Sequence, residues 1–66
     1  MKLEELRIGQ KVRFQPDGEE EFENGIVKEI YDTPMVWVVY NCPDWDRYEN
    51  YPAGITPISD LKLGWK

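Results

Sequence analysis

Met35-Val36-Trp37-Val38-Val39-Tyr40-Asn41 is the stretch of this 66-residue chain that decides its fold. Branched and aromatic side chains fill the run, a composition typical of a β-strand. At about 3.3 Å per residue it spans roughly 20 Å. Its side chains alternate between two faces, and we expect the inward face to carry Val36, Val38 and Tyr40 and the opposite face Trp37 and Val39. Because both faces are apolar, the strand is predicted to be central and strongly curved.

Two further strands are predicted before this run. Residues 11–15 alternate polar and apolar side chains, which indicates a half-buried strand. Residues 26–31 form the second, although Val27 and Ile30 have opposite parity along it. A bulge or a sharp bend would bring both side chains to one face, and Gly25 is placed to permit it.

Turn residues separate these strands and indicate what lies outside them. Pro16-Asp17-Gly18 ends the first strand and Asp32-Thr33-Pro34 precedes the third. In the lead-in, Leu6 and Ile8 are expected to tuck under the core. The remaining predicted elements are a loop over residues 42–50, a fourth strand over 51–56, at most one short helical turn near residues 58–61, and a last strand over 63–65 that pairs with the first.

Five short strands without a long helix predict an all-β fold: a small, strongly bent antiparallel barrel that forms a single domain over residues 1–66. Rolling the sheet hides edges that so small a sheet would otherwise expose. A chain of this length buries only about 60% of the surface that its unfolded form exposes, so it needs a compact core. Cys42 is the only cysteine and can form no disulfide within the chain; a buried, unreactive thiol is expected.

Four short motifs follow one another along the chain, namely Leu6-x-Ile8-Gly9-x-x-Val12-x-Phe14, Gly25-x-Val27-x-x-Ile30, Val36-x-Val38-x-Tyr40 and Asp60-Leu61. They resemble the first three strands, and the turn before the last strand, of the SH3-like small β-barrels of the Tudor and KOW type. The resemblance implies an SH3-like barrel. The segment 58–65, with 36–42 and 44–51, also resembles small uncharacterised bacterial and phage-encoded proteins, which implies no activity.

Charge and composition exclude several classes of function. The chain carries 8 basic and 13 acidic residues and no histidine, for a net charge of −5. This charge argues against nucleic acid as a partner, because phosphate contacts need clustered Lys and Arg. Without histidine, the commonest general base and metal ligand is missing. We therefore expect no enzyme, no catalytic residues, no cofactor and no metal site.

The location of the protein is also suggested by its sequence. No apolar run approaches the roughly 20 residues of a membrane span, and the first residues lack the apolar core of a signal peptide. A lone cysteine fits a reducing compartment. These features predict a cytoplasmic protein with no membrane association.

An aromatic stretch late in the chain is the first candidate site. Trp45, Tyr48 and Tyr51 are spaced three apart, with Asp44 and Asp46 among them. A ring face attracts a cation by about 0.5–2 kcal/mol, and carboxylates add Coulomb attraction. The stretch therefore predicts a site for a methylammonium group or a Lys/Arg-bearing peptide. The alternative is that these rings fold down over the end of the barrel and extend a core that is too small.

The outer face of the third strand is the second candidate. If Trp37 and Val39 are exposed there, they form an apolar patch of the kind that marks a partner surface or the seam of a weak homodimer; otherwise the protein is a monomer. The alternative is that Trp65 or the second strand covers the patch.

The acidic run from Asp17 to Glu23 is the third candidate. It is expected to be an exposed hairpin loop that favours solubility, or else a mimic of nucleic-acid phosphates that occupies a basic cleft. It lacks the alternating ligand pattern of a calcium loop. The basic residues Lys11, Arg13 and Lys28 are expected to pair with acids of the hairpin.

The sequence as a whole predicts a small, non-enzymatic protein-interaction module that binds a peptide or protein through exposed aromatics. The alternative is an acidic, phage-type inhibitor or nucleic-acid-mimicking decoy that binds a basic host protein. The predicted partner-binding residues are Trp37, Val39, Asp44, Trp45, Asp46, Tyr48 and Tyr51.

Overall fold

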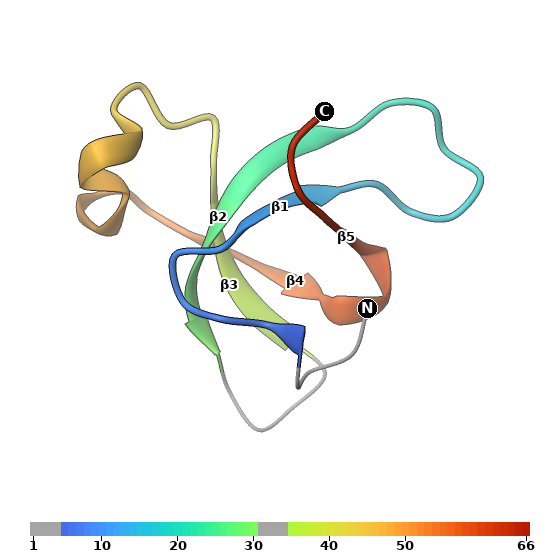
Figure 1. Ribbon diagram of the computed structural model, residues 1–66, viewed down its shortest axis with the longest axis horizontal. Helices are drawn as coiled ribbons and strands as arrows, with labels where there is room; N and C mark the ends of the chain where they lie inside the picture. The colour runs from blue at the N-terminus through green and yellow to red at the C-terminus, as the bar shows by residue number, and fades with distance from the viewer. Residues whose placement is uncertain (1–4, 31–34) are drawn as a thin grey trace.

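The computed structural model describes residues 5–30 and 35–66. They form five strands, shown in Figure 1: β1 (Lys11–Phe14), β2 (Glu23–Ile30), β3 (Met35–Tyr40), β4 (Gly54–Pro57) and β5 (Leu61–Leu63). All pairings are antiparallel, and the strand order in the sheet is β4-β3-β2-β1-β5. The helical structure within the described residues is limited to 3-10 turns. The prediction of an all-β, five-stranded antiparallel fold is therefore confirmed.

The pairing of β2 with β3 contains one inserted residue. The register shifts between Val27 and Glu29, so Lys28 is the extra residue of a β-bulge. The insertion lets both Val27 and Ile30 contribute to the inner side of the sheet, where Ile30 packs against the core. The predicted bulge is thus confirmed, at Lys28 and not at Gly25.

Gly25 contributes to the bend of the sheet through its lack of a side chain and not through a bulge. A Cβ atom at this position would lie 2.6 Å from Cγ1 of Val38 and 2.8 Å from the carbonyl oxygen of Val39. No side chain fits at such distances, so β2 and β3 can approach this closely only because the residue is glycine. The strong bend of the sheet therefore depends on a missing side chain at one position of β2.

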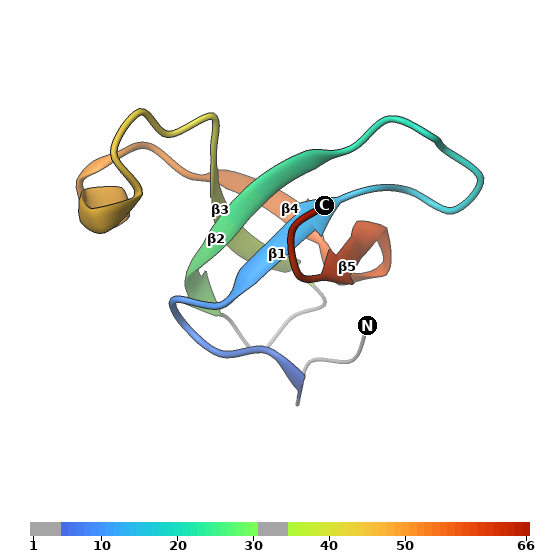
Figure 2. The same ribbon diagram turned by 45° about the horizontal axis from the view of Figure 1, so that its top comes forward.

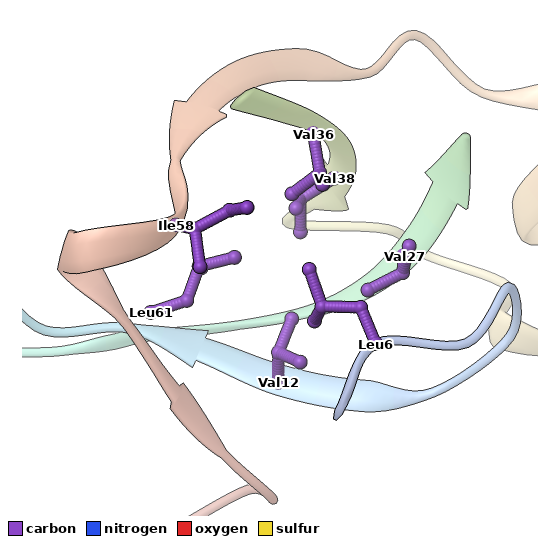
Figure 3. Close-up of a cluster of buried hydrophobic side chains, with 7 residues drawn as sticks. All are labelled: Leu6, Val12, Val27, Val36, Val38, Ile58 and Leu61. Carbon is purple, nitrogen blue, oxygen red and sulfur yellow. The ribbon is translucent and has the colours of Figure 1, made fainter. Parts of the chain in front are cut away.

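The core lies inside the bend of the sheet (Figure 3). Its buried members come from the lead-in, four of the strands or their connections: Leu6, Val12, Val27, Val36, Val38, Ile58 and Leu61. Phe14, Ile30 and Tyr40 pack against them while remaining partly exposed. Valine dominates because a narrow, strongly bent sheet leaves room for small branched side chains between its walls.

Of the two lead-in residues that were expected to pack under the core, only one does so. Leu6 is buried in the core, as expected, but Ile8 is 64% exposed and the prediction for it was wrong. Gly9 adopts a positive φ of 87°, and its N–H donates to the Val27 carbonyl oxygen over 2.8 Å. This turn reverses the chain directly after Ile8 and leaves its side chain in water.

The edges of the sheet, β4 and β5, are joined by a 3-10 turn, η3 (Ile58–Asp60). A helical turn was predicted near residues 58–61, and this one confirms it. Pro57 occupies the cap position, and no side chain caps the turn. The amide of Gln15 donates to the Asp60 carbonyl oxygen over 2.8 Å, which fastens the turn to the end of β1.

A second 3-10 segment, η2 (Trp45–Asn50), lies where the sequence predicted a loop. The expectation of at most one helical turn was therefore wrong. The fourth strand also begins later than predicted, at Gly54, and the last strand earlier, at Leu61, although it does pair with β1. Figures 1 and 2 both place η2 on one side of the sheet and the β1–β2 loop on the other, with the C-terminal segment ending between them.

Candidate interaction surface

Asp44 begins η2 and holds its first turn. Its carboxylate accepts a hydrogen bond from the Asp46 amide over 3.2 Å, and its carbonyl oxygen accepts from the Arg47 amide over 3.1 Å. Arg47 Nε also lies 3.8 Å from the Asp44 carboxylate, an exposed pair that contributes little. Asp44 therefore acts as a helix cap, a role that explains why this segment is not a loop.

Two contacts fasten η2 to the sheet. The Lys28 ammonium donates to the Tyr51 carbonyl oxygen over 2.9 Å, so the bulge of β2 reaches the segment directly after η2. The Tyr48 hydroxyl lies beside Gly9, 3.4 Å from the position that a Cβ would take there. Both tyrosines are half-buried as a result.

The outer face of the sheet carries a second buried cluster, apart from the main core. Val39 is 0% exposed, and Ile26, its partner across β2 and β3, and Cys42 are also buried. The expectation that Val39 is open to a partner was therefore wrong. The expected burial of the Cys42 thiol is confirmed, and this thiol donates to the Asp44 carbonyl oxygen over 3.2 Å.

Trp65 accounts for much of this cover. Its indole N–H donates to the Gly25 carbonyl oxygen over 2.8 Å, and the Lys11 ammonium lies 4.8 Å from the centre of its ring. Lys11, Ile26 and Val39 are successive partners across β1, β2 and β3, so the ring lies next to the row that ends in Val39. This agrees with the alternative in which Trp65 covers the outer face.

Trp45 and Trp65 form a ring pair. Their centroids are 4.9 Å apart and their planes are tilted by 56°. Trp45 thus meets Trp65, whereas Tyr48 lies beside Gly9 and Tyr51 accepts from Lys28 through its backbone. The three aromatics spaced along the sequence consequently have different neighbours, and all three are half-buried.

The tryptophan pair lines an open hollow of about 380 Å³. The other residues that line it are Phe22, Glu23, Asn24, Asn41 and Cys42. A neighbouring hollow of about 350 Å³ is lined by Phe14, Pro16, Glu19, Glu21, Phe22 and Glu23. Phe22 and Glu23 belong to both, so the two hollows adjoin. We call the combined region, made of Glu19, Glu21, Phe22, Glu23, Trp45 and Trp65, the acidic aromatic surface.

Trp37 lies outside this surface. It is half-buried and lines a smaller hollow of about 200 Å³ with Lys28, Glu29 and Ala53. Its partner across β3 and β4 is Ile55, which is 54% exposed. Of the predicted partner-binding residues, only Trp45 belongs to the acidic aromatic surface. Its acids come from the acidic run that was the third candidate, and Phe22 and Trp65 were missed as binding aromatics. The position of Phe22 between acidic residues was the signal that the sequence offered for it.

The acidic run is exposed throughout residues 17–23, as predicted. Asp17 pairs with Lys62, and the hydrogen bond from this ammonium lowers the pKa of the Asp17 carboxyl. Arg13 donates to the carbonyl oxygens of Leu63 and Gly64 and to the side chain of Gln15, so its guanidinium is used within the fold. Glu19, Glu20, Glu21 and Glu23 thus lie exposed in sequence on either side of Phe22.

Comparison with models of protein families, with curated proteins and with solved structures finds no match to this chain. Within the part of the chain that the structure describes, no helix has the length and apolar character needed to cross a membrane. Over residues 5–30 and 35–66, no three His, Cys, Asp or Glu side chains gather in a way that could hold a metal ion.

Proposed function

We propose that this protein is a small, non-enzymatic interaction module whose acidic aromatic surface binds a Lys- or Arg-bearing segment of another protein. The observation that carries the proposal is the position of Phe22 and Glu23, which line both hollows. Through them, the ring pair of Trp45 and Trp65 and the acids of the β1–β2 loop become one continuous region.

The chemistry of this surface favours a cation. An aromatic ring face attracts an ammonium or guanidinium group by about 0.5–1 kcal/mol at exposed sites, and carboxylates nearby add to the attraction. The chain's own lysines support this preference. Lys11 lies 4.8 Å from the ring centre of Trp65, and Lys66 lies 5.8 Å from that of Phe22.

Rigid aromatic anchors also suit a binding surface. Trp45 and Trp65 hold each other in place, and the indole of Trp65 is fixed by its bond to Gly25. Side chains that are ordered before binding lose little conformational entropy when a partner arrives. Phe22, which is 42% exposed, supplies the most accessible ring of the surface.

Binding to short synthetic peptides tests the proposal. A panel of peptides bearing Lys or Arg, each matched to a peptide with Gln at those positions, is titrated into the labelled protein and followed by NMR. We expect the cationic peptides alone to shift the signals of Phe22, Glu23 and Trp45. Phe22→Ser should weaken their binding, whereas Leu63→Ser, which removes an exposed side chain from β5, should not. Equal binding of the Gln peptides, or no binding at all, would refute the proposal.

A second candidate is the acidic decoy, which the complete exposure of residues 17–23 favours. A decoy of this kind binds a basic protein through charge alone, so its affinity falls steeply with added salt. Changing Glu19, Glu20 and Glu21 together to Gln should then abolish binding while Phe22→Ser has no effect. The interaction module predicts sensitivity to Phe22→Ser, and the two candidates are separated by that difference.

A further inference from the structure

The segment after β5 lies along the acidic aromatic surface. The Gly64 amide donates to the Lys11 carbonyl oxygen over 2.9 Å, and Trp65 is bound to Gly25 as described above. Lys66 follows at once. These contacts continue the line of β5 past its last ladder pair and carry the chain to the start of β2, where Phe22 and Asn24 lie.

Lys66 is held there by an asparagine and a ring. The Asn24 side chain accepts a hydrogen bond from the Lys66 amide and donates one to the Lys66 carbonyl oxygen, both over 3.3 Å. An asparagine amide that donates and accepts in this way matches the groups of any extended backbone. The Lys66 ammonium lies over the Phe22 ring at 5.8 Å. The backbone and the cation of one lysine are thus bound together, in the manner of a short peptide ligand.

We propose that Lys66 is a built-in competitor for the acidic aromatic surface. This inference rests on the proposed function, and it adds that a partner's cation must displace the Lys66 ammonium from Phe22 in order to use that ring. The contacts suit an exchangeable group. Lys66 is exposed, and its two hydrogen bonds to Asn24 are longer than the usual 2.9–3.0 Å or so.

Competition of this kind lowers the apparent affinity for a cationic ligand. The effect grows with the fraction of molecules in which Lys66 occupies the Phe22 ring. A ligand that binds only the open form sees its apparent affinity reduced by the open fraction. An exposed contact of a cation with a ring is weak, so its removal should strengthen binding of a cationic ligand by about two- to five-fold.

The test compares Lys66→Gln with Arg7→Gln. Both variants remove one positive charge, but Arg7 belongs to the lead-in to β1, where it donates to the Leu6 carbonyl oxygen. The probe is an acetylated, amidated tetralysine peptide, and its dissociation constant is measured by NMR titration at low ionic strength. We expect Lys66→Gln to bind it about two- to five-fold more tightly than the wild type, and Arg7→Gln to bind it as the wild type does.

Three results overturn the inference. If both variants bind equally more tightly, the gain comes from net charge and not from competition. If Lys66→Gln binds as the wild type does, Lys66 is no competitor, although the proposed function stands. If no form of the protein binds the peptide, the proposed function fails and this inference fails with it.

Discussion

Trp65 donates its indole hydrogen to the carbonyl oxygen of Gly25 over 2.8 Å, and this bond joins the segment after β5 to β2 across the intervening β1. Gly25 is the residue of β2 at which a side chain would collide with Val38 and Val39 of β3. One hydrogen bond therefore connects Trp65 to the residue whose missing side chain lets β2 and β3 pack together. The stability of the fold and the placement of the tryptophan pair should depend on each other.

Trp65→Phe keeps a ring over the outer face but removes the donor. We expect the free energy of unfolding to fall by about 1 kcal/mol, because the Gly25 carbonyl loses its partner. Urea unfolding measures the change. In the wild type, the indole proton of Trp65 should exchange slowly with solvent. Rapid exchange of that proton, together with unchanged stability of the variant, would show that the bond is not formed in solution.

Gly25→Ala should be severely destabilising. The added methyl group would meet Val38 and the backbone of Val39 at less than 3.0 Å. Overpacking of this kind typically costs about 1–3 kcal/mol, and the backbone contact places this case at the upper end. Gly54→Ala is the matched control, since its Cβ would meet only Tyr40 at 3.8 Å, an ordinary contact. Equal midpoints of urea unfolding for the two variants would contradict the role given to Gly25.

Val39→Ala tests the buried cluster on the outer face. Removal of two methyl groups from a fully buried site should cost about 1.5–3 kcal/mol of unfolding free energy. Ile55→Ala, on the exposed face of β4, should change stability by no more than about 0.5 kcal/mol. Both values come from chemical denaturation. A Val39 variant as stable as the Ile55 variant would mean that Val39 is not buried in solution.

Tyr40 should make stability fall in alkali. Burial of the Tyr40 side chain raises the pKa of its phenol above the ordinary value of 10.0. The 2.8 Å hydrogen bond with Thr56 acts in the opposite direction but is the smaller effect. The neutral phenol is therefore favoured in the folded state. Its contribution is complete below about pH 10 and is lost as the pH rises through the folded pKa.

Tyr40→Phe is the variant that checks this behaviour. It cannot ionise, so its unfolding free energy should decline less than that of the wild type between about pH 9 and about pH 11. The variant will be less stable at neutral pH because Thr56 loses its 2.8 Å bond with Tyr40 and keeps only the 3.4 Å bond to the Gly54 carbonyl, and only the slope with pH is compared. Parallel slopes would assign the alkaline loss of stability to other groups.

The central strand and the number of strands were accessible from sequence because they depend on local alternation. The bulge was also accessible, as one of the two ways, with a sharp bend, in which Val27 and Ile30 could share a face. Its position at Lys28 was not, because the parity of two residues leaves the inserted residue undetermined. Residues 45–50 were read as a loop because 3-10 turns lack a strong apolar period, and the cap formed by Asp44 depends on geometry.

The candidate surface was harder to predict because it is made of distant segments. Phe22, Trp45 and Trp65 are far apart along the chain and meet only through the strand order. Spacing within one segment favoured Trp45, Tyr48 and Tyr51, which the fold separates. Val39 was misplaced for a similar reason: it lies on the face of the sheet near Trp65, which follows it by 26 positions.

Because residues are buried on both faces of the single sheet, fewer of its positions can be substituted during evolution. Trp45 and Trp65 shield hydrophobic residues and are also the proposed means of contact with other molecules. A mutation at either position that improves binding can be retained only if the chain still folds. Phe22 does not have both roles, because it lies exposed at the end of the β1–β2 loop. New specificities should therefore arise by exchange at Phe22 and its acidic neighbours, while the tryptophans stay fixed.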